Sequence, residues 1–296
     1  MSGSDFETLT RRLREATEWV SSGLGALSML RESPSRLPEL ARYPLAAGGK
    51  RVRPFLVRTA CLASGGDPAR ALGAAVAVEM VHTYSLVHDD LPMLDDDGLR
   101  RGLPTLHTLH GVPCSVLAGD LLLVEAFAEL LLSPLPPQTL AAMAGRLARA
   151  AGPSRLAGGQ YMDMNPPPSV DRLWVERMIL GKTAAMIRVS LELGCMAAGR
   201  TPPGIDRVSS AGDRLGLLFQ LTDDILDVRG TASELGKSPS KDSAQGKANL
   251  VTFAGLEAAE AEAASLSEEV ADLFEALEGD WRDAVTLARF LPRRRS

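Results

Sequence analysis

Segments with the hydrophobic period of an α-helix dominate this sequence and most narrowly limit the folds open to it. Each is long enough for several helical turns, and they cover residues 9–20, 69–87, 117–132, 140–151, 170–193, 207–228 and 256–277. Groups of Pro and Gly separate them, as at 64–68, 165–168 and 201–204. No run of alternating apolar and polar residues predicts a strand. We therefore predict an all-α chain, folded as a single domain over residues 1–296.

The composition is that of a helical protein with an ordinary hydrophobic core. Hydrophobic residues make up 45% of the chain but aromatic residues only 4%, which disfavours a strand-rich sandwich. The net charge of −5 gives no basic excess to attract a nucleic acid. The most apolar stretch, residues 116–132, contains Asp120, Glu125 and Glu129, whereas a membrane span tolerates few charges. We predict no nucleic-acid partner and no membrane span.

The first residues and the cysteines indicate a cytoplasmic protein. Residues 1–20 carry charges throughout and lack the apolar core of a signal peptide. Cys61, Cys114 and Cys195 form no CxxC pair, so neither a disulfide framework nor a zinc site is indicated. We predict buried, unreactive thiols.

Two clusters of aspartates carry the strongest indication of chemistry. The second cluster is Asp223-Asp224-Ile225-Leu226-Asp227. A helix places Asp223 and Asp227, four residues apart, on one face about one turn from each other. Like charges at that spacing destabilise a helix, so we expect a cation between them.

The first cluster, residues 88–97, reads HDDLPMLDDD. Asp89 and Asp95 would point about 240° apart on a regular helix. Pro92, however, disfavours helical backbone at Leu91, so the regular helix should end there. We therefore predict that the chain curls and returns Asp95 to the side of Asp89.

The two clusters need cations if they share one cavity. Their six carboxylates are Asp89, Asp90, Asp95, Asp223, Asp224 and Asp227. A site whose ligands are carboxylate oxygens, and whose ion must also bind phosphate oxygens, favours Mg²⁺ over zinc. Either cluster alone could equally be a solvated acidic patch, because short runs of Asp are common on surfaces. Two clusters on apolar segments, about 130 residues apart, are harder to explain in that way.

Basic residues occur where an anion would need them. They lie in GGKRVRP at 48–54, in LRRG at 99–102, in GKT at 181–183 and in LGK at 235–237. Arg forks and Lys point charges commonly bind diphosphates. GGK is not a nucleotide P-loop, because it lacks the first Gly of GxxxxGK and the Ser or Thr after Lys.

The order of these motifs resembles that of the trans-isoprenyl diphosphate synthases. GGKRVRP, HDDLPMLDDD with LRRG, GGQ at 158–160, GKT, and QLTDDILD with LGK match over about residues 40–250. The chain is most similar to bacterial farnesyl diphosphate synthases, whose first Asp motif has the same two-residue expansion. The resemblance implies a single large helical bundle around a deep central cavity, and a homodimer.

The resemblance also implies a reaction. Such enzymes join isopentenyl diphosphate to dimethylallyl or geranyl diphosphate, with Mg²⁺ as cofactor, about three ions in each site. Metal ions stabilise charge on the departing diphosphate. The allylic cation forms in an apolar cavity, the alkene attacks it, and proton loss completes the step.

Individual roles follow from the resemblance. The implied metal ligands are Asp89, Asp90, Asp95 and Asp223, with Asp224 and Asp227 in support. The residues implied to bind the allylic diphosphate are Arg100, Lys182 and Lys237. Those implied to bind isopentenyl diphosphate are Lys50, Arg53, His82 and Arg101. The residues implied to place oxygens near the carbocation are Thr183 and Gln220.

Product length is expected to depend on Tyr84, with Ser85 beside it. Tyr84 precedes Asp89 by five residues, about 7.5 Å along a helix. A side chain there can cross the floor of the cavity that receives the growing tail, although a core aromatic with a paired hydroxyl is the alternative. In the family that this chain resembles, an aromatic residue here marks short products. We expect mainly the fifteen-carbon farnesyl diphosphate, with geranylgeranyl diphosphate or another length as the alternative.

Other functions match part of the pattern. A class I terpene cyclase also ionises allylic diphosphates, but it would carry an Asn/Ser/Glu metal motif in place of DDILD. Squalene-type condensing enzymes lack GGKRxRP. A non-catalytic subunit that only regulates a partner synthase would be expected to have lost an Asp cluster, and both are intact here.

The remaining polar residues have simpler explanations. We expect residues 292–295 to form a disordered basic tail rather than a site. His107 and His110 lack a third ligand nearby, so a structural or solvated role is favoured over zinc. Asp163, after GGQ, could act on the site indirectly, by contacting residues that bind the substrates.

Overall fold

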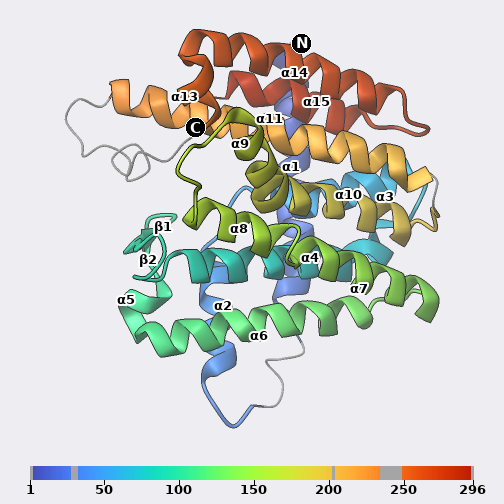
Figure 1. Cartoon of the computed structure of the whole chain (residues 1–296). Helices are drawn as coiled ribbons and strands as arrows, with labels where there is room; N and C mark the ends of the chain where they lie inside the picture. The colour runs from blue at the N-terminus through green and yellow to red at the C-terminus, as the bar shows by residue number, and fades with distance from the viewer. Residues whose placement is uncertain (1–2, 28–32, 202–203, 234–248, 295–296) are drawn as a thin grey trace. The chain divides into compact units, whose positions relative to one another are not determined.

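The computed structural model describes residues 3–27, 33–201, 204–233 and 249–294 (Figure 1). Its α-helices are α1 (Gly3–Leu24), α2 (Leu37–Ala46), α3 (Val52–Ala63), α4 (Pro68–Asp89), α5 (Leu106–His110), α6 (Val112–Leu131), α7 (Pro137–Ala151), α8 (Leu156–Met164), α9 (Arg172–Ile179), α10 (Ala185–Ala197), α11 (Gly204–Ser233), α13 (Leu250–Ala254), α14 (Leu256–Glu275) and α15 (Arg282–Phe290). A π-helical segment, η2 (Leu180–Ala184), and a 3₁₀ segment, η3 (Leu291–Arg293), complete the helical structure of these residues. The predicted all-α fold is confirmed.

The helices group into two compact units. The N-terminal unit comprises Thr10–Ala148 and Val189–Thr201. The C-terminal unit comprises Met1–Leu9, Arg149–Arg188 and Pro202–Ser296. Each unit packs helices of its own, and the single domain expected over residues 1–296 stays a prediction.

Helix α4 is the centre of the N-terminal unit. Asp67 caps it by accepting a hydrogen bond from the Ala69 backbone N–H at 2.9 Å, and Pro68 takes the first helical position, where its missing N–H costs little. Between Ala71 and Val81 the helix buries mostly Ala and Val, and it packs against α3 and α6. This rigid core fixes the position of the polar residues at its C-terminal end.

Helix α11 has the same role in the C-terminal unit. It packs against α9, η2, α13 and α14. A Cβ added at Gly216 of α11 would lie 2.2 Å from the Cβ of Ala184, so the absence of a side chain lets α11 approach η2 closely. Gln220, Asp223, Asp224 and Asp227 follow on the same helix.

The helical segment predicted over residues 170–193 contains a π-helical turn. Helix α9, η2 and α10 follow one another without a loop, and η2 carries Lys182 and Thr183. A π bulge inserts an extra residue into a helix and is frequent at functional sites. The predicted helical segment is present, and the π bulge within it is a feature that the sequence analysis did not predict.

A short antiparallel hairpin, absent from the prediction, follows the first Asp cluster. Strand β1 (Leu99–Arg100) pairs with β2 (Leu103–Pro104). Arg101 and Gly102 form its turn with φ of 55° and 76°, and positive φ at both positions matches the twist of a two-residue hairpin. Strands of two residues are too short to produce an alternating pattern.

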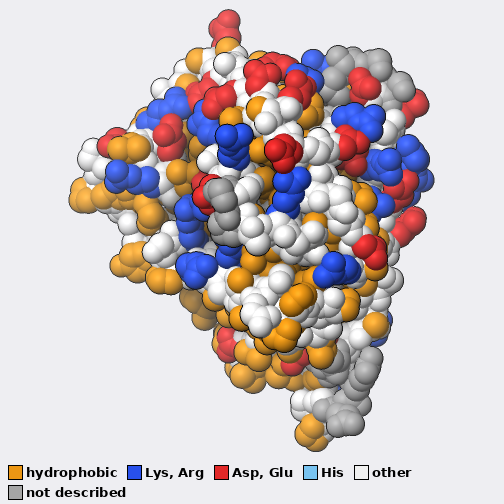
Figure 2. All heavy atoms as spheres, turned by 90° about the vertical axis from the view of Figure 1, so that its right-hand side faces the viewer, with side chains coloured by type: hydrophobic (Ala, Val, Ile, Leu, Met, Phe, Trp, Pro, Cys, Tyr) orange, Lys and Arg blue, Asp and Glu red, His pale blue; other side chains and the backbone are white. Residues whose placement is uncertain are grey.

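The surface carries charges of both signs. Basic and acidic side chains are interspersed on the face drawn in Figure 2. None of the described helices has both the length and the apolar character that a membrane crossing requires.

Candidate active site

The first Asp cluster forms a tight turn where α4 ends. The backbone N–H of Asp95 donates a hydrogen bond to the carbonyl oxygen of Asp89 at 2.9 Å. The N–H of Asp97 donates to the carbonyl oxygen of Asp90 at 3.2 Å. The predicted curl, which returns Asp95 to the side of Asp89, is therefore confirmed.

Arg100 of β1 binds two carboxylates of this turn. Its Nε donates to Asp90 Oδ1 at 2.8 Å, and its Nη2 lies 3.1 Å from Asp97 Oδ2. Asp90 is 5% exposed, and this burial raises the pKa of its carboxyl group, an effect that Arg100 partly offsets. The guanidinium fork thus lies beside a predicted metal ligand.

Several Arg side chains lie near enough to His82 on α4 to affect its pKa. Burial lowers the pKa of His82 well below its usual value, and the charges of Arg53, Arg101, Arg51 and Arg100 lower it further. The imidazole is therefore neutral at pH 7, with one nitrogen that donates and one that accepts a hydrogen bond. The structure brings together His82, Arg53 and Arg101, three of the four residues expected to bind isopentenyl diphosphate.

The fourth of these residues, Lys50, lies in the loop between α2 and α3 and is exposed. Arg101 of the hairpin donates a hydrogen bond from Nη1 to the carbonyl oxygen of Gly48 in this loop. A Cβ added at Gly49 would lie 2.6 Å from Arg101 Cζ, so only glycine permits this close contact. The hairpin therefore holds the loop that carries Lys50.

Tyr84 and Ser85, the expected length determinants, lie on the last turns of α4. The Tyr84 ring meets the His88 ring edge to face, with centroids 5.7 Å apart. Burial, and next the charge of Asp89, raise the pKa of Tyr84, so its hydroxyl stays protonated. Ser85 donates a hydrogen bond to the carbonyl oxygen of His82 at 2.9 Å. Tyr84 is thus packed against the helix end rather than free to swing.

A chain of hydrogen bonds organises the second Asp cluster in the C-terminal unit. The Thr183 hydroxyl donates to Gln220 Oε1 at 2.8 Å, and Gln220 Nε2 donates to Asp224 Oδ1 at 2.9 Å. The backbone N–H of Leu250 donates to the other Asp224 oxygen at 3.2 Å. Burial raises the pKa of Asp224 to about 6, although these two hydrogen bonds lower it in part. Asp224 therefore orients Gln220, which in turn orients Thr183.

Lys182 of η2 pairs with an aspartate that the sequence indicated only weakly. Its Nζ lies 2.6 Å from Oδ2 of Asp163, three residues after Gln160 of the GGQ motif. Helix α8, which carries Asp163, packs tightly on η2: a Cβ added at Gly159 would lie 2.1 Å from the Lys182 backbone nitrogen. The two motifs GGQ and GKT therefore form one local structure.

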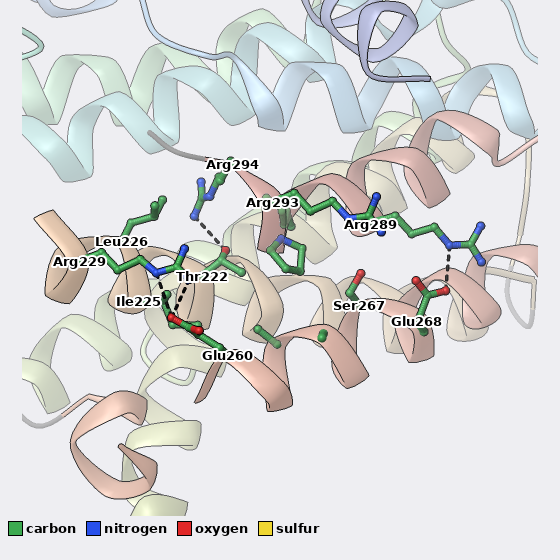
Figure 3. A pocket seen from close by; sticks show the side chains of 14 residues that line it. Thr222, Ile225, Leu226, Arg229, Glu260, Ser267, Glu268, Arg289, Arg293 and Arg294 are labelled. Atoms are coloured by element: carbon green, nitrogen blue, oxygen red, sulfur yellow. Dashed lines mark hydrogen bonds and ion pairs between the residues drawn. The ribbon is translucent and has the colours of Figure 1, made fainter. Parts of the chain in front are cut away.

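Arg294 corrects the expectation of a disordered basic tail. Its guanidinium donates to Asp223 Oδ1. The same guanidinium donates to Thr222 Oγ1 at 2.9 Å (Figure 3). It also lies 4.9 Å above the centre of the Phe219 ring, and the residue is only 7% exposed. Local sequence patterns do not predict these contacts, because they join residues some 70 positions apart.

A cavity of about 290 Å³ opens beside Arg294 within the C-terminal unit. Two ion pairs line it, Arg229 with Glu260 and Arg289 with Glu268 (Figure 3). Residues of α11, α14, α15 and η3 form its wall. Three of its arginines, Arg229, Arg289 and Arg294, are paired with carboxylates. We therefore assign the candidate site to the two Asp clusters and not to this cavity.

A family profile described as Polyprenyl synthetase matches residues 34–286. The chain belongs to the polyprenyl synthetase family. Among curated members, geranylgeranyl pyrophosphate synthase 11 of Arabidopsis thaliana is 41% identical over 91% of this chain and 77% of its own length. The farnesyl diphosphate synthase of Geobacillus stearothermophilus is 38% identical over 82% of this chain and 84% of its own.

Solved structures of the polyprenyl synthetase family share the fold. The geranylgeranyl pyrophosphate synthetase of Pyrococcus horikoshii is 31% identical, with a TM-score of 0.88 over 98% of this chain and 99% of its own. An FPP/GFPP synthase of Zymomonas mobilis is 29% identical, with a TM-score of 0.85 over 96% and 99%. The resemblance to isoprenyl diphosphate synthases is confirmed, and the chain is a short-chain prenyltransferase of isoprenoid biosynthesis.

The donors of the two clusters suit Mg²⁺, which takes oxygen ligands. Within the described parts of the chain, no three or more His, Cys, Asp or Glu side chains are already gathered as a metal site. Asp90 and Asp223 are instead paired with Arg100 and Arg294. The residues fit the ion by donor chemistry, and its entry would displace these arginine contacts.

Some sequence expectations concern other positions. Lys237 falls in residues 234–248, outside those the structure describes. His107 Nδ1 lies 3.1 Å from Thr105 Oγ1, which agrees with a structural role. His88 Nε2 lies 3.2 Å from the Val116 carbonyl oxygen, so it links α4 to α6.

Proposed function

We propose that this chain condenses isopentenyl diphosphate with dimethylallyl and geranyl diphosphate, using Mg²⁺, to give mainly farnesyl diphosphate of fifteen carbons. The observation that carries the proposal is the end of α4. There the carboxylate turn, the Arg100 fork and Tyr84 lie on consecutive parts of one rigid helix and its hairpin. The similarity to a bacterial farnesyl diphosphate synthase supports it.

The metal has one task in this proposal. Bound Mg²⁺ supplies charge neutralisation for the departing diphosphate. Its proposed ligands are Asp89, Asp90, Asp95 and Asp223, with Asp224 and Asp227 in support. About three ions in each site would match this number of carboxylates.

The chain's own residues bind and orient the substrates. Arg100, Lys182 and Lys237 receive the allylic diphosphate, and Lys50, Arg53, His82 and Arg101 receive isopentenyl diphosphate. Neutral His82 adds a hydrogen bond without a further charge among the arginines. The Thr183 hydroxyl donates its hydrogen bond to Gln220 Oε1, so its lone pairs are available to stabilise positive charge on the allylic carbon.

A twenty-carbon product is the second candidate. The curated relatives at 41% identity are named geranylgeranyl pyrophosphate synthases, which favours a longer product. Tyr84 favours the shorter product, because a bulky ring packed on His88 can limit the depth of the cavity. Product length therefore depends on whether Tyr84 lies in the path of the growing tail.

Product sizing tests both the function and its length. Purified chain with isopentenyl and dimethylallyl diphosphates and Mg²⁺ is expected to yield geranyl diphosphate transiently and farnesyl diphosphate as the main product. Tyr84→Ala should shift the product to twenty carbons or more, while Tyr84→Phe, which keeps the ring, should not. A mainly twenty-carbon product from the wild type would favour the second candidate. An absence of any condensation product would refute the proposed activity.

We also propose that the chain forms a homodimer. Helix α6 exposes Leu117, Val124 and Leu131, which are 54%, 64% and 50% exposed. They recur every seven residues, so they form one apolar stripe along the helix. An exposed stripe of large aliphatic side chains is typical of a protein contact surface.

A further inference from the structure

The loop that contains Lys50, and that leads into Arg53 at the start of α3, is anchored by a residue to which neither the motif nor the function assigns a role. Arg51 is the middle cation of GGKRVRP, yet its side chain is only 4% exposed. Its Nη1 donates to Glu79 on α4, and its Nη2 donates to the carbonyl oxygen of Leu45 at the end of α2. Arg51 therefore turns inward while Lys50, beside it, is exposed.

The backbone at Arg51 requires such an anchor. Arg51 has φ of 46°, in the left-handed region that is unfavourable for a residue with a Cβ. It stands at the N-cap of α3 without a side-chain cap hydrogen bond. Strain of this kind persists only where surrounding contacts hold it, and here those contacts are Glu79 and Leu45.

Glu79 lies where its negative charge can stabilise both Arg51 and Arg101. It is 2% exposed on an otherwise apolar part of α4, and His82 follows one turn later on the same face. The carboxylate is close enough to both Arg51 and Arg101 to stabilise their charges. A buried carboxylate among several guanidinium groups reduces their mutual repulsion, so they can stay together before an anion binds.

Stability alone does not explain this pair. Buried ion pairs contribute little net stability, and well-packed apolar residues of similar volume often replace them without loss. What a buried pair does supply is a fixed geometry, because both charges must remain in contact. The pair joins the loop after α2 to α4, and Arg101 holds the same loop through Gly48 from the hairpin.

We infer that Arg51 and Glu79 form a positioning pair that fixes the loop so that Lys50 and Arg53, and not Arg51, receive the diphosphate of the isopentenyl substrate. The inference rests on the proposed function, because it names the device behind one of its two substrate sites. It predicts that the pair controls affinity for isopentenyl diphosphate and leaves the allylic site unaffected.

A double substitution separates positioning from charge balance. Arg51→Met with Glu79→Met removes the pair without leaving a buried charge, so the fold should survive. The KM for isopentenyl diphosphate is expected to rise about tenfold, since small misplacement of binding groups is costly, while the allylic KM and kcat change by less than about threefold. The single change Glu79→Gln should raise the same KM at least as much, because it leaves Arg51 unpaired.

The N-terminal unit offers a matched control. Arg146 and Glu192 form another largely buried pair, with atoms 2.9 Å apart and side chains 19% and 5% exposed. Arg146→Met with Glu192→Met should change the thermal midpoint by a similar amount but leave the KM for isopentenyl diphosphate as in the wild type. An equal rise of that KM in the control would show that general loosening, and not positioning, is responsible.

The outcomes also separate this inference from the proposed function. No turnover by the wild type with isopentenyl and any allylic diphosphate contradicts the function. Affinity for inorganic pyrophosphate, measured by calorimetry, then still tests the pair, because the double variant should bind it more weakly. An unchanged KM for isopentenyl diphosphate in a folded double variant, or equal rises for both substrates, would overturn the inference. If the double variant does not fold, Arg51→Lys is the replacement, because it keeps the positive charge but loses the second hydrogen bond, to the Leu45 carbonyl oxygen. A wild-type KM for isopentenyl diphosphate in the Arg51→Lys variant would also overturn the inference.

Discussion

Individual charges of the candidate site are already balanced in the protein alone. Asp90 is paired with Arg100, and Asp223 is paired with Arg294. The Asp90 carboxylate is buried, so the loss of its partner is costly and a cation must approach as the Arg100 guanidinium leaves. Each guanidinium that leaves becomes available for a diphosphate. The residues therefore favour joint binding of metal and diphosphate over binding of either alone.

Removal of single carboxylates tests the metal role. Asp89→Ala and Asp223→Ala should each lower kcat by about 100-fold or more, because charge stabilisation of the leaving group is lost. The helical circular dichroism should be unchanged, since neither residue belongs to the apolar core. Asp206→Ala, in the exposed first turn of the same helix as Asp223, is the control and should retain activity. Full activity in excess chelator would contradict the Mg²⁺ assignment.

His82 gives a pH dependence whose sign is fixed by its environment. The folded protein keeps this imidazole neutral, because burial and the nearby arginines lower its pKa well below 6.5. The unfolded chain binds a proton below about pH 6.5, so stability is lost as the pH falls through that value. The loss should approach about 1.4 kcal/mol for each further pH unit until the folded group titrates.

Denaturant unfolding between pH 5 and pH 8 measures this effect. His82→Asn should flatten the acid side of the stability profile. His110→Asn, an exposed histidine on α5, controls for the loss of any histidine. Profiles of equal slope for the wild type and His82→Asn would show that His82 is not held neutral.

At the level of elements, features set by neighbouring residues could be predicted from the sequence, and features set by long-range contacts could not. The helices were predictable, as at residues 69–87, because a helical apolar period or a continuous apolar run is a pattern among neighbouring residues. The curl after α4 was predictable because Pro92 acts on its own neighbour. The η2 interruption, the hairpin and the Arg294 contact were not, since each depends on a single inserted residue or on partners far apart in the chain.

Helix α8 and the π-helical segment η2 pack closely against each other. Gly159 of α8 lies against the backbone of Lys182 in η2, where a Cβ would be only 2.1 Å from the nitrogen. Gly159→Ala should therefore cost about 1–3 kcal/mol of unfolding free energy and lower kcat, because η2 must move with Lys182 and Thr183. Gly204→Ala, where no atom lies within 4 Å of the added Cβ, should leave both unchanged. A Gly159→Ala variant with wild-type stability would show that α8 and η2 are not tightly packed.

At the scale of the whole molecule, the proposed function draws on residues from both compact units. The N-terminal unit carries the first Asp cluster and Tyr84, and the C-terminal unit carries the second cluster and Lys182. Neither unit alone contains a full set of the proposed ligands. The α6 stripe belongs to the N-terminal unit, and the second cluster belongs to the C-terminal unit.

The proposed homodimer gives a prediction for the α6 stripe. Val124 is its middle member and the most exposed of the three, so a charge there would be buried if two copies meet through α6. Val124→Lys should raise the dimer dissociation constant by at least about tenfold, because an unpaired buried ammonium is costly. Sedimentation velocity over a concentration series measures this directly. Leu173→Lys, which places the same charge at an exposed leucine of α9, should leave the wild-type dimer intact. A wild type that sediments as a monomer at every concentration, or a Val124→Lys variant as dimeric as the wild type, would mean that the stripe does not join two copies of the chain.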